Sequence, residues 1–194
     1  MGKILTHMTM SLDGFIAEPD DQIGELFDWY QAGDITVDNP SDDVVFSVDE
    51  GGAEVLHQLT DNVGALISGR RLFDIADGWN DVHPVGAPVV VVTHQPPSNA
   101  ERWPRTTFVN GVEAAVARAR EIAGDRDVTI ASADIIQQAL NLGLVDELCV
   151  SQVPVLFGAG IRYFGELVGG HILLDDPTVV EGRRALHLRY PVRH

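Results

Sequence analysis

The 194-residue sequence contains few basic residues. It has thirteen Lys and Arg residues against twenty-nine Asp and Glu residues, which gives a formal net charge of −16 at pH 7. Nucleic-acid binding needs a basic face that neutralises phosphates, so this balance argues against DNA or RNA as a partner. Lys3 is the only lysine, which argues against Schiff-base chemistry and against a phosphate loop built around an internal lysine.

Cysteine and metal-binding patterns are also scarce. Cys149 is the only cysteine, so no internal disulfide can form, and its apolar neighbours Leu148 and Val150 predict an inert buried thiol. The seven histidines form no H-E-x-x-H pattern, and we expect no metal site. The sequence also lacks the G-x-S-x-G pattern of many hydrolases.

Long hydrophobic runs are missing as well. No apolar segment approaches the roughly 18 residues that a membrane span needs, and the N-terminus lacks the pattern of a signal peptide. We therefore expect a cytoplasmic protein with no membrane partner. A hydrophobic content of 45% indicates a globular chain, and its length fits one domain over residues 1–194.

What the sequence does contain is an alternation of strand and helix patterns, which predicts an α/β fold with a largely parallel sheet. Strands are expected at 3–11, 64–69, 89–93, 107–109, 127–131 and 144–155. Helices are expected at 22–31, 49–61, from 70 onward, and at 111–123 and 133–142, the last capped by Ser132. Residues 33–48 are expected to form a mobile loop. Segments 171–174, 178–182 and 185–190 predict an antiparallel C-terminal edge.

Asp13-Gly14 interrupts the first predicted strand before Phe15 to Ala17 resumes it. A carboxylate at such a break is costly to bury without a partner, and glycine permits a turn or a close ligand approach. We interpret this break as the floor of a ligand cleft, although an Asp-Gly turn on the surface fits the same residues.

Four later strand ends carry residues suited to a ligand, because ligands of α/β sheets lie beyond the carboxyl ends of the strands. Ser68 to Arg71 combines glycine, two arginines and a helix start, and Ile130 to Asp134 is a turn of small residues. Thr93-His94-Gln95 and the glycine-containing segment from Pro154 to Arg162 are the other two. The alternative for Ser68 to Arg71 is a surface arginine pair, and for Ile130 to Asp134 it is tight strand–helix packing. The alternative for the Thr93 segment is a strand-ending turn, and for the glycine-containing segment it is a plain connection between strands.

Taken in order, several of these segments resemble the dihydrofolate reductase superfamily, in the branch of the riboflavin-biosynthesis reductase domain. The resemblance covers nearly the whole chain and is carried by 10–17, 69–73, 90–94, 143–148 and 154–164. It implies a three-layer reductase fold that binds NADPH across the sheet. It also implies reduction of a pterin- or pyrimidine-like molecule, as in 5-amino-6-(5-phosphoribosylamino)uracil reductases, and a homodimer.

The resemblance also implies roles for individual residues. Ile16 and Ala17 would line the nicotinamide site. Gly69, Arg70 and Arg71 would hold phosphates, and Thr93 with His94 would lie near the adenosine 2′-phosphate. The pyrophosphate would meet the turn made of Ala131, Ser132, Ala133 and Asp134. The substrate would contact the loop residues Phe157, Gly158, Gly160 and Arg162.

Asp13 is the predicted proton donor or substrate-orienting group, with Asp28 in reserve. Two departures from the family pattern bear on the cofactor. Ala131-Ser132 stands where Gly-Gly is usual, and Gln95 stands where many members have arginine. The first departure motivates a second hypothesis, a nucleotide- or pterin-binding protein without turnover. A structural dimer module is a third.

Overall fold

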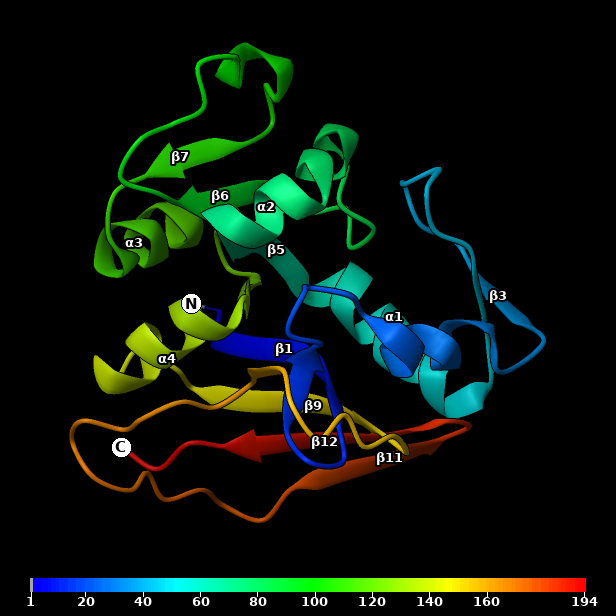
Figure 1. Ribbon diagram of the computed structural model, residues 1–194. Helices are drawn as coiled ribbons and strands as arrows, with labels where there is room; N and C mark the ends of the chain where they lie inside the picture. The colour runs from blue at the N-terminus through cyan, green and yellow to red at the C-terminus, as the bar shows by residue number, and fades with distance from the viewer. Residues whose placement is uncertain (1) are drawn as a thin grey trace.

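A computed structural model describes residues 2–194 and shows one large sheet between layers of helices. The sheet has eight strands in the order β11-β12-β9-β1-β8-β5-β6-β7 (Figure 1). Their bounds are β1 Ile4–Ser11, β5 Val63–Gly69, β6 Val89–Val92, β7 Thr107–Val109, β8 Asp127–Ala131, β9 Glu147–Val153, β11 Thr178–Gly182 and β12 Ala185–Pro191.

The six strands from β9 to β7 in that order pair in parallel, whereas β12 pairs antiparallel with β9, and β11 with β12. This arrangement confirms the predicted α/β fold with a mostly parallel sheet and an antiparallel C-terminal edge.

Helices cover both faces of the sheet. The α-helices are α1 Glu50–Asn62, α2 Arg70–Ile75, α3 Val112–Ala123 and α4 Ala133–Asn141, and the 3-10 helices are η1 Gly24–Gln31, η2 Asp77–Asp81 and η3 Ala100–Arg102. Buried residues of α3 and α4 pack with Ile67 and Ile130 on one face, while Leu66 and Val91 pack with α2 on the other. Successive strand residues point to opposite faces, so the near-continuous apolar strands supply hydrophobic cores on both faces of the sheet. Figure 1 shows α3 and α4 to the left of the sheet and α1 to the right.

Two expectations about secondary structure are wrong. Residues 33–48 contain an antiparallel pair, β3 Ile35–Val37 with β4 Phe46–Val48, where a loop was expected. Val37, Phe46 and Val48 are buried against η1 and α1, so tertiary packing orders a segment whose acidic composition suggested a loop. Residues 171–174 form no strand, and only Leu174 makes an isolated bridge, to Val192.

A short antiparallel pair of strands lies outside the main sheet. It joins β2 Phe15–Ala17 to β10 Ile161–Arg162, so the strand break at Asp13 lies next to the glycine loop. A Cβ on Gly160 would lie 2.1 Å from the carbonyl oxygen of Ala17, and φ at Gly160 is +153°. Glycine is therefore required for this pairing. Within residues 2–194, no helix has the length and apolar character to cross a bilayer.

Candidate functional site

A cleft of about 500 Å³ opens where the carboxyl ends of β5, β6 and β8 meet β2 and the starts of α2 and α4. Every predicted cofactor residue except Ala131 lines it: Ile16, Ala17, Gly69, Arg70, Arg71, Thr93, His94, Ser132, Ala133 and Asp134. Ala131 lies beneath, packed in the core on the α2 side of the sheet. Parallel pairing explains this convergence, because it places the carboxyl ends of neighbouring strands at one edge.

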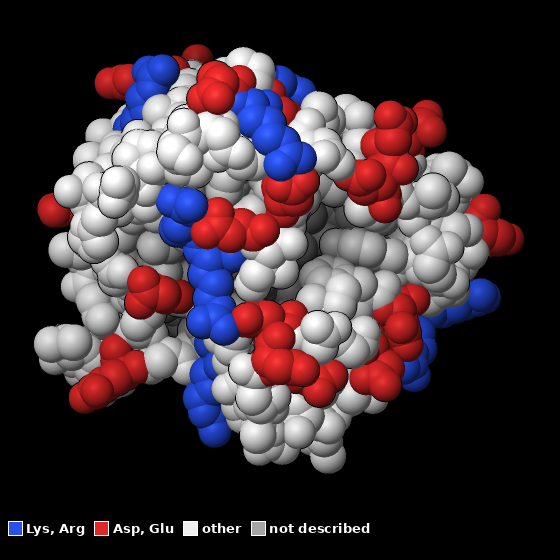
Figure 2. Space-filling model, turned by 45° about the horizontal axis from the view of Figure 1, so that its top comes forward, with Lys and Arg blue, Asp and Glu red and all other residues white. Residues whose placement is uncertain are grey.

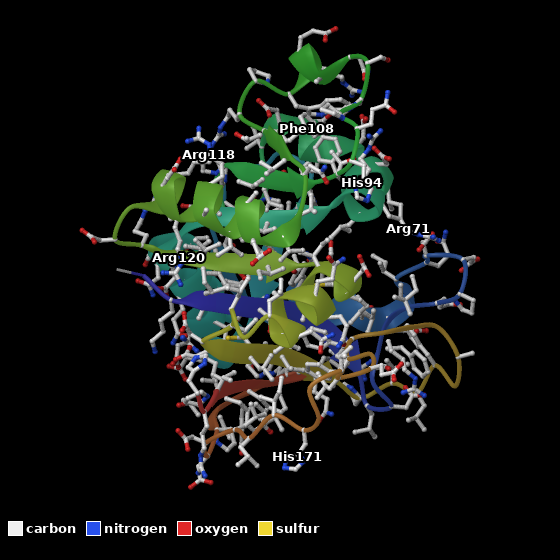
Figure 3. All side chains as sticks on the ribbon, turned by 90° about the vertical axis from the view of Figure 1, so that its left-hand side faces the viewer. Arg71, His94, Phe108, Arg118, Arg120 and His171 are labelled. Carbon is white, nitrogen blue, oxygen red and sulfur yellow. The ribbon has the colours of Figure 1, made fainter. Side chains whose placement is uncertain are left out.

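Figure 3 shows on which side of the molecule the side chains of the cleft lie. Arg71 and His94 lie toward one side of the molecule, and Arg118 and Arg120, on α3, project toward the opposite side. Arg71 comes from the start of α2, and His94 follows β6. The arginines of the cleft are thus separated from those of α3.

The start of α4 offers backbone donors to the cleft. The expectation that Ser132 caps this helix is wrong, because no side chain caps it. The Ser132 hydroxyl instead accepts a hydrogen bond of 2.8 Å from the Gly69 N–H, across two neighbouring strand ends. Amides in an uncapped first turn can bind an anion, although the carboxylate of Asp134, held by Gln138 at 2.8 Å, lies in that same turn.

Both arginines predicted to bind phosphate are paired with carboxylates. The Arg71 guanidinium donates to both oxygens of Asp21, with Nε 3.0 Å from Oδ1, and Asp21 raises the pKa of Arg71. The Arg70 Nε donates to Asp74 at 2.8 Å, and its Nη1 donates to the carbonyl of Gln95 at 2.9 Å. Arg70 therefore lies beside the turn that follows β6.

The rim of the cleft beyond β6 is polar. Thr93 Oγ1 donates to the Gln95 carbonyl at 2.9 Å, and His94 Nδ1 lies 3.0 Å from Oδ1 of Asn110. Asn110 and Gly111 also line the cleft. A Cβ on Gly111 would have no atom within 4 Å, so the space in front of α3 is open.

Asp13 lies outside the cleft lining. Its carboxylate accepts hydrogen bonds from Ser11 Oγ at 2.6 Å, the Phe157 N–H at 3.1 Å and the Gly158 N–H at 2.7 Å. These bonds, that from Ser11 most strongly, lower the pKa of Asp13. A carboxylate held ionised in this way acts as an acceptor, so the geometry favours a positioning role over proton donation.

The other predicted site residues also lie outside the lining. Asp28 is an exposed residue of η1, with Oδ2 3.5 Å from Nη2 of Arg184. Arg162 stacks over the ring of Phe15 at 4.8 Å. Phe157, Gly158 and Gly160 do not line the cleft, although their neighbour Ile161 does.

Sequence reasoning missed the apolar part of the cleft. Its lining includes Met8, Ile23, Phe27, Leu72, Ile75 and Ile161. Ile23 and Phe27 belong to the helix expected at 22–31, and their apolar spacing predicted no role in a ligand site. In the structure, Leu26 and Trp29 are the buried residues of η1, whereas Ile23 and Phe27 line the cleft. Apolar spacing in the sequence does not distinguish these two pairs. Among residues 2–194, no cluster of His, Cys, Asp and Glu suited to a metal ion occurs.

Burial favours the protonated form of the Cys149 thiol. Cys149 is 7% exposed on β9, and burial raises its pKa to about 12. The buried, protonated thiol agrees with the expectation of an inert cysteine.

The sheet order and its covering helices define a dihydrofolate reductase-like fold. The dihydrofolate reductase of Enterococcus faecalis complexed with NADP(H) superposes with a TM-score of 0.60 at 16% identity, over 100% of this chain and 98% of that one. A riboflavin biosynthesis protein of Shewanella sp. PV-4, described as putative, superposes with a TM-score of 0.70 at 23% identity and covers 99% of both chains. These identities establish the fold.

Sequence comparison identifies the family within that fold. The model of the RibD C-terminal domain matches residues 2–170, so the chain belongs to this family. The uncharacterized protein YwjB of Bacillus subtilis is 26% identical over 167 residues, which are 85% of this chain and 84% of that protein.

Proposed function

We propose that this chain is an NADPH-dependent reductase of a small pterin- or pyrimidine-like molecule. The observation that carries the proposal is the cleft itself. Residues predicted to hold a dinucleotide come from four separate parts of the chain and line one continuous space. The structural neighbour from E. faecalis was solved with NADP(H), which supports the same cofactor class.

The lining fits a dinucleotide. Uncapped amides at α4 offer donors for a pyrophosphate, and Gly69 leaves room beside them, because a Cβ there would lie 3.2 Å from Ile135 and 3.3 Å from the Ser132 hydroxyl. Ile16 and Ala17 give an apolar surface for the nicotinamide ring. When bound, the cofactor would supply the hydride, and the chain's residues would orient it and exclude water.

Arg70 supports NADPH over NADH. Gln95 removes one charge available to a 2′-phosphate, but the Arg70 guanidinium binds the carbonyl of that residue at 2.9 Å. It lies close to Thr93, on the predicted adenosine side. Arg70→Gln should therefore weaken NADPH binding and leave NADH binding nearly unchanged.

The test begins with fluorescence titration of NADPH. Gly69→Ala should weaken NADPH about 10-fold, because the added Cβ narrows the cleft. The matched control is Gly169→Ala, whose Cβ would meet no atom within 4 Å. Absorbance at 340 nm is then followed with a panel of pterins and pyrimidines. Absence of NADPH binding, or an equal effect of both variants, would refute the proposal.

A second candidate, a nucleotide- or pterin-binding protein without turnover, rests on the acids of the site. Asp13 is held ionised outside the cleft, Asp21 is bound to Arg71, and Asp134 is bound to Gln138. None of these carboxylates is set up as a proton donor, although a water could deliver the proton. NADPH binding without oxidation across the whole panel would favour this candidate.

Homodimerisation remains a separate proposal, based on the family resemblance and on the β11–β12 edge. Light scattering at micromolar concentration tests it. A mass near that of one 21.1 kDa chain would refute it.

A further inference from the structure

The cleft has two chemically different ends. Polar groups gather where β6, β8 and α4 meet, around Thr93, His94 and Asp134. The other end lies between η1, α2 and the first two strands, and its side chains are almost all hydrocarbon. We call it the apolar end, and its residues are Met8, Ile16, Ile23, Phe27, Leu72 and Ile75.

Charge at the apolar end is already balanced. Asp21 and Arg71 line it together, joined by the two-pronged bond between carboxylate and guanidinium. Arg70, the other arginine of the lining, is bound to Asp74. Asp28, the second predicted acid, lies on η1 and pairs with Arg184. It does not line the cleft and therefore adds no charge to the apolar end.

An anionic ligand would meet an unfavourable field at this end. The Arg71 side chain is 71% exposed, and exposed ion pairs are weak, so a phosphate could separate Arg71 from Asp21. The freed Asp21 carboxylate would still line the same space, and like charges repel at this distance. Figure 2 shows acidic side chains around a hollow on one face of the molecule, and the chain carries a net charge of −16. An uncharged ring avoids this repulsion and buries apolar surface against Phe27 and the aliphatic side chains.

We propose that the apolar end binds an uncharged, flat ring compound that carries no phosphate or carboxylate. This inference rests on the proposed reductase function and narrows its substrate class. Within the pterin- and pyrimidine-like molecules, it favours the unphosphorylated ones. A ribosyl-phosphate tail of the kind implied by the family resemblance would meet Arg71 at the apolar end, where Asp21 already balances the charge of that arginine.

Matched pairs of probes test the inference. Riboflavin against FMN, and neopterin against neopterin monophosphate, share a ring and differ by one phosphate. Equilibrium dialysis with and without saturating NADP⁺ measures their affinities without turnover. The uncharged member of each pair should bind at least 10-fold tighter. Equal or tighter binding of the phosphorylated members, or no binding of either uncharged probe, overturns the inference.

Two variants show whether Asp21 is the cause. Asp21→Asn removes the repelling charge and frees Arg71, so the phosphorylated probes should bind at least 3-fold tighter and the uncharged ones should not change. Asp74→Asn is the matched control, because it makes the same change beside Arg70, and Asp74 does not line the cleft. An equal response to both variants contradicts the role of Asp21. NADP⁺ titration of the parent protein tests the proposed function separately. If the parent protein does not bind NADP⁺, the proposed function is refuted, independently of how the probes bind.

Discussion

The carboxylate of Asp13 accepts a hydrogen bond of 2.7 Å from the Gly158 N–H, 145 residues further along the chain. A second bond, from the Phe157 N–H to the other carboxylate oxygen, makes the contact two-pronged. The strand break after β1 thereby fixes the glycine loop that leads into β10. Asp13 is in this view a residue that positions the loop beside the cleft.

Asp13→Asn is expected to lower kcat/KM about 10-fold in any reductase assay, because an amide replaces one acceptor oxygen with a donor and loosens the loop. NADPH affinity should change less than about 2-fold, since Asp13 does not line the cleft. Because the pKa of Asp13 is lowered, its titration should leave no limb in the activity profile between about pH 6 and pH 8. Asp176→Asn, on an exposed loop, is the control. An acidic or basic limb that disappears in Asp13→Asn would restore Asp13 as the proton donor.

The Ser132–Gly69 contact predicts different effects for two small substitutions of Ser132. Ser132 has φ +157° and ψ 124°, a conformation that side chains adopt at a cost, and its hydroxyl binds the Gly69 N–H. Ser132→Ala keeps the strain and leaves that N–H without its partner, so the free energy of unfolding should fall by about 1 kcal/mol.

Ser132→Gly loses the same bond but relieves the strain, so it should be at least as stable as Ser132→Ala. It should also bind NADPH several-fold tighter, because a side chain leaves the start of α4. Urea unfolding and NADPH titration of the two variants provide the measurements. Weaker NADPH binding in Ser132→Gly than in Ser132→Ala would contradict this account.

Two neighbouring histidines, His7 and the buried His187, predict acid sensitivity. His7 Nε2 lies 3.1 Å from Ser151 Oγ, which lies 2.8 Å from Nδ1 of His187. Burial lowers the pKa of both histidines from 6.5 to about 4. Between those values the unfolded chain binds more protons than the native one, so stability falls as the pH drops below about 6.5.

At pH 5 the loss is up to about 2 kcal/mol for each histidine. Urea unfolding at pH 7 and pH 5 measures it. His187→Gln should reduce the difference between the two pH values, and His57→Gln, at an exposed position of α1, should preserve it. Equal stability of the parent protein at both pH values would refute this assignment.

Tyr163 anchors the loop after β10 in the core. Its hydroxyl is buried, donates to the Cys149 carbonyl at 2.8 Å and accepts from Thr6 Oγ1 at 2.8 Å. Tyr163→Phe should lower the free energy of unfolding by about 1–2 kcal/mol, because it leaves both partners unsatisfied. Tyr190→Phe, at a half-buried position of β12, should cost less than about 0.5 kcal/mol. Urea unfolding distinguishes them, and equal values would contradict the role of the Tyr163 hydroxyl.

The strands and helices were largely predictable, because hydrophobic periodicity is a local property of the chain. The β-branched run at Val89–Val92 and the apolar spacing of α3 each predicted one element correctly. The β3–β4 pair was missed, because its apolar residues are interrupted by acidic ones and become ordered only against η1 and α1.

The sequence by itself determined the α/β fold, and it placed the residues that line the cleft at neighbouring strand ends, since parallel pairing sends those ends to one edge. Only the tertiary structure decided which polar groups are already partnered. Asp21 and Arg71 are 50 residues apart, Gly69 and Ser132 are 63 apart, and Asp13 and Gly158 are 145 apart. Contacts at such separations depend on how whole elements pack, which no local pattern of residues encodes.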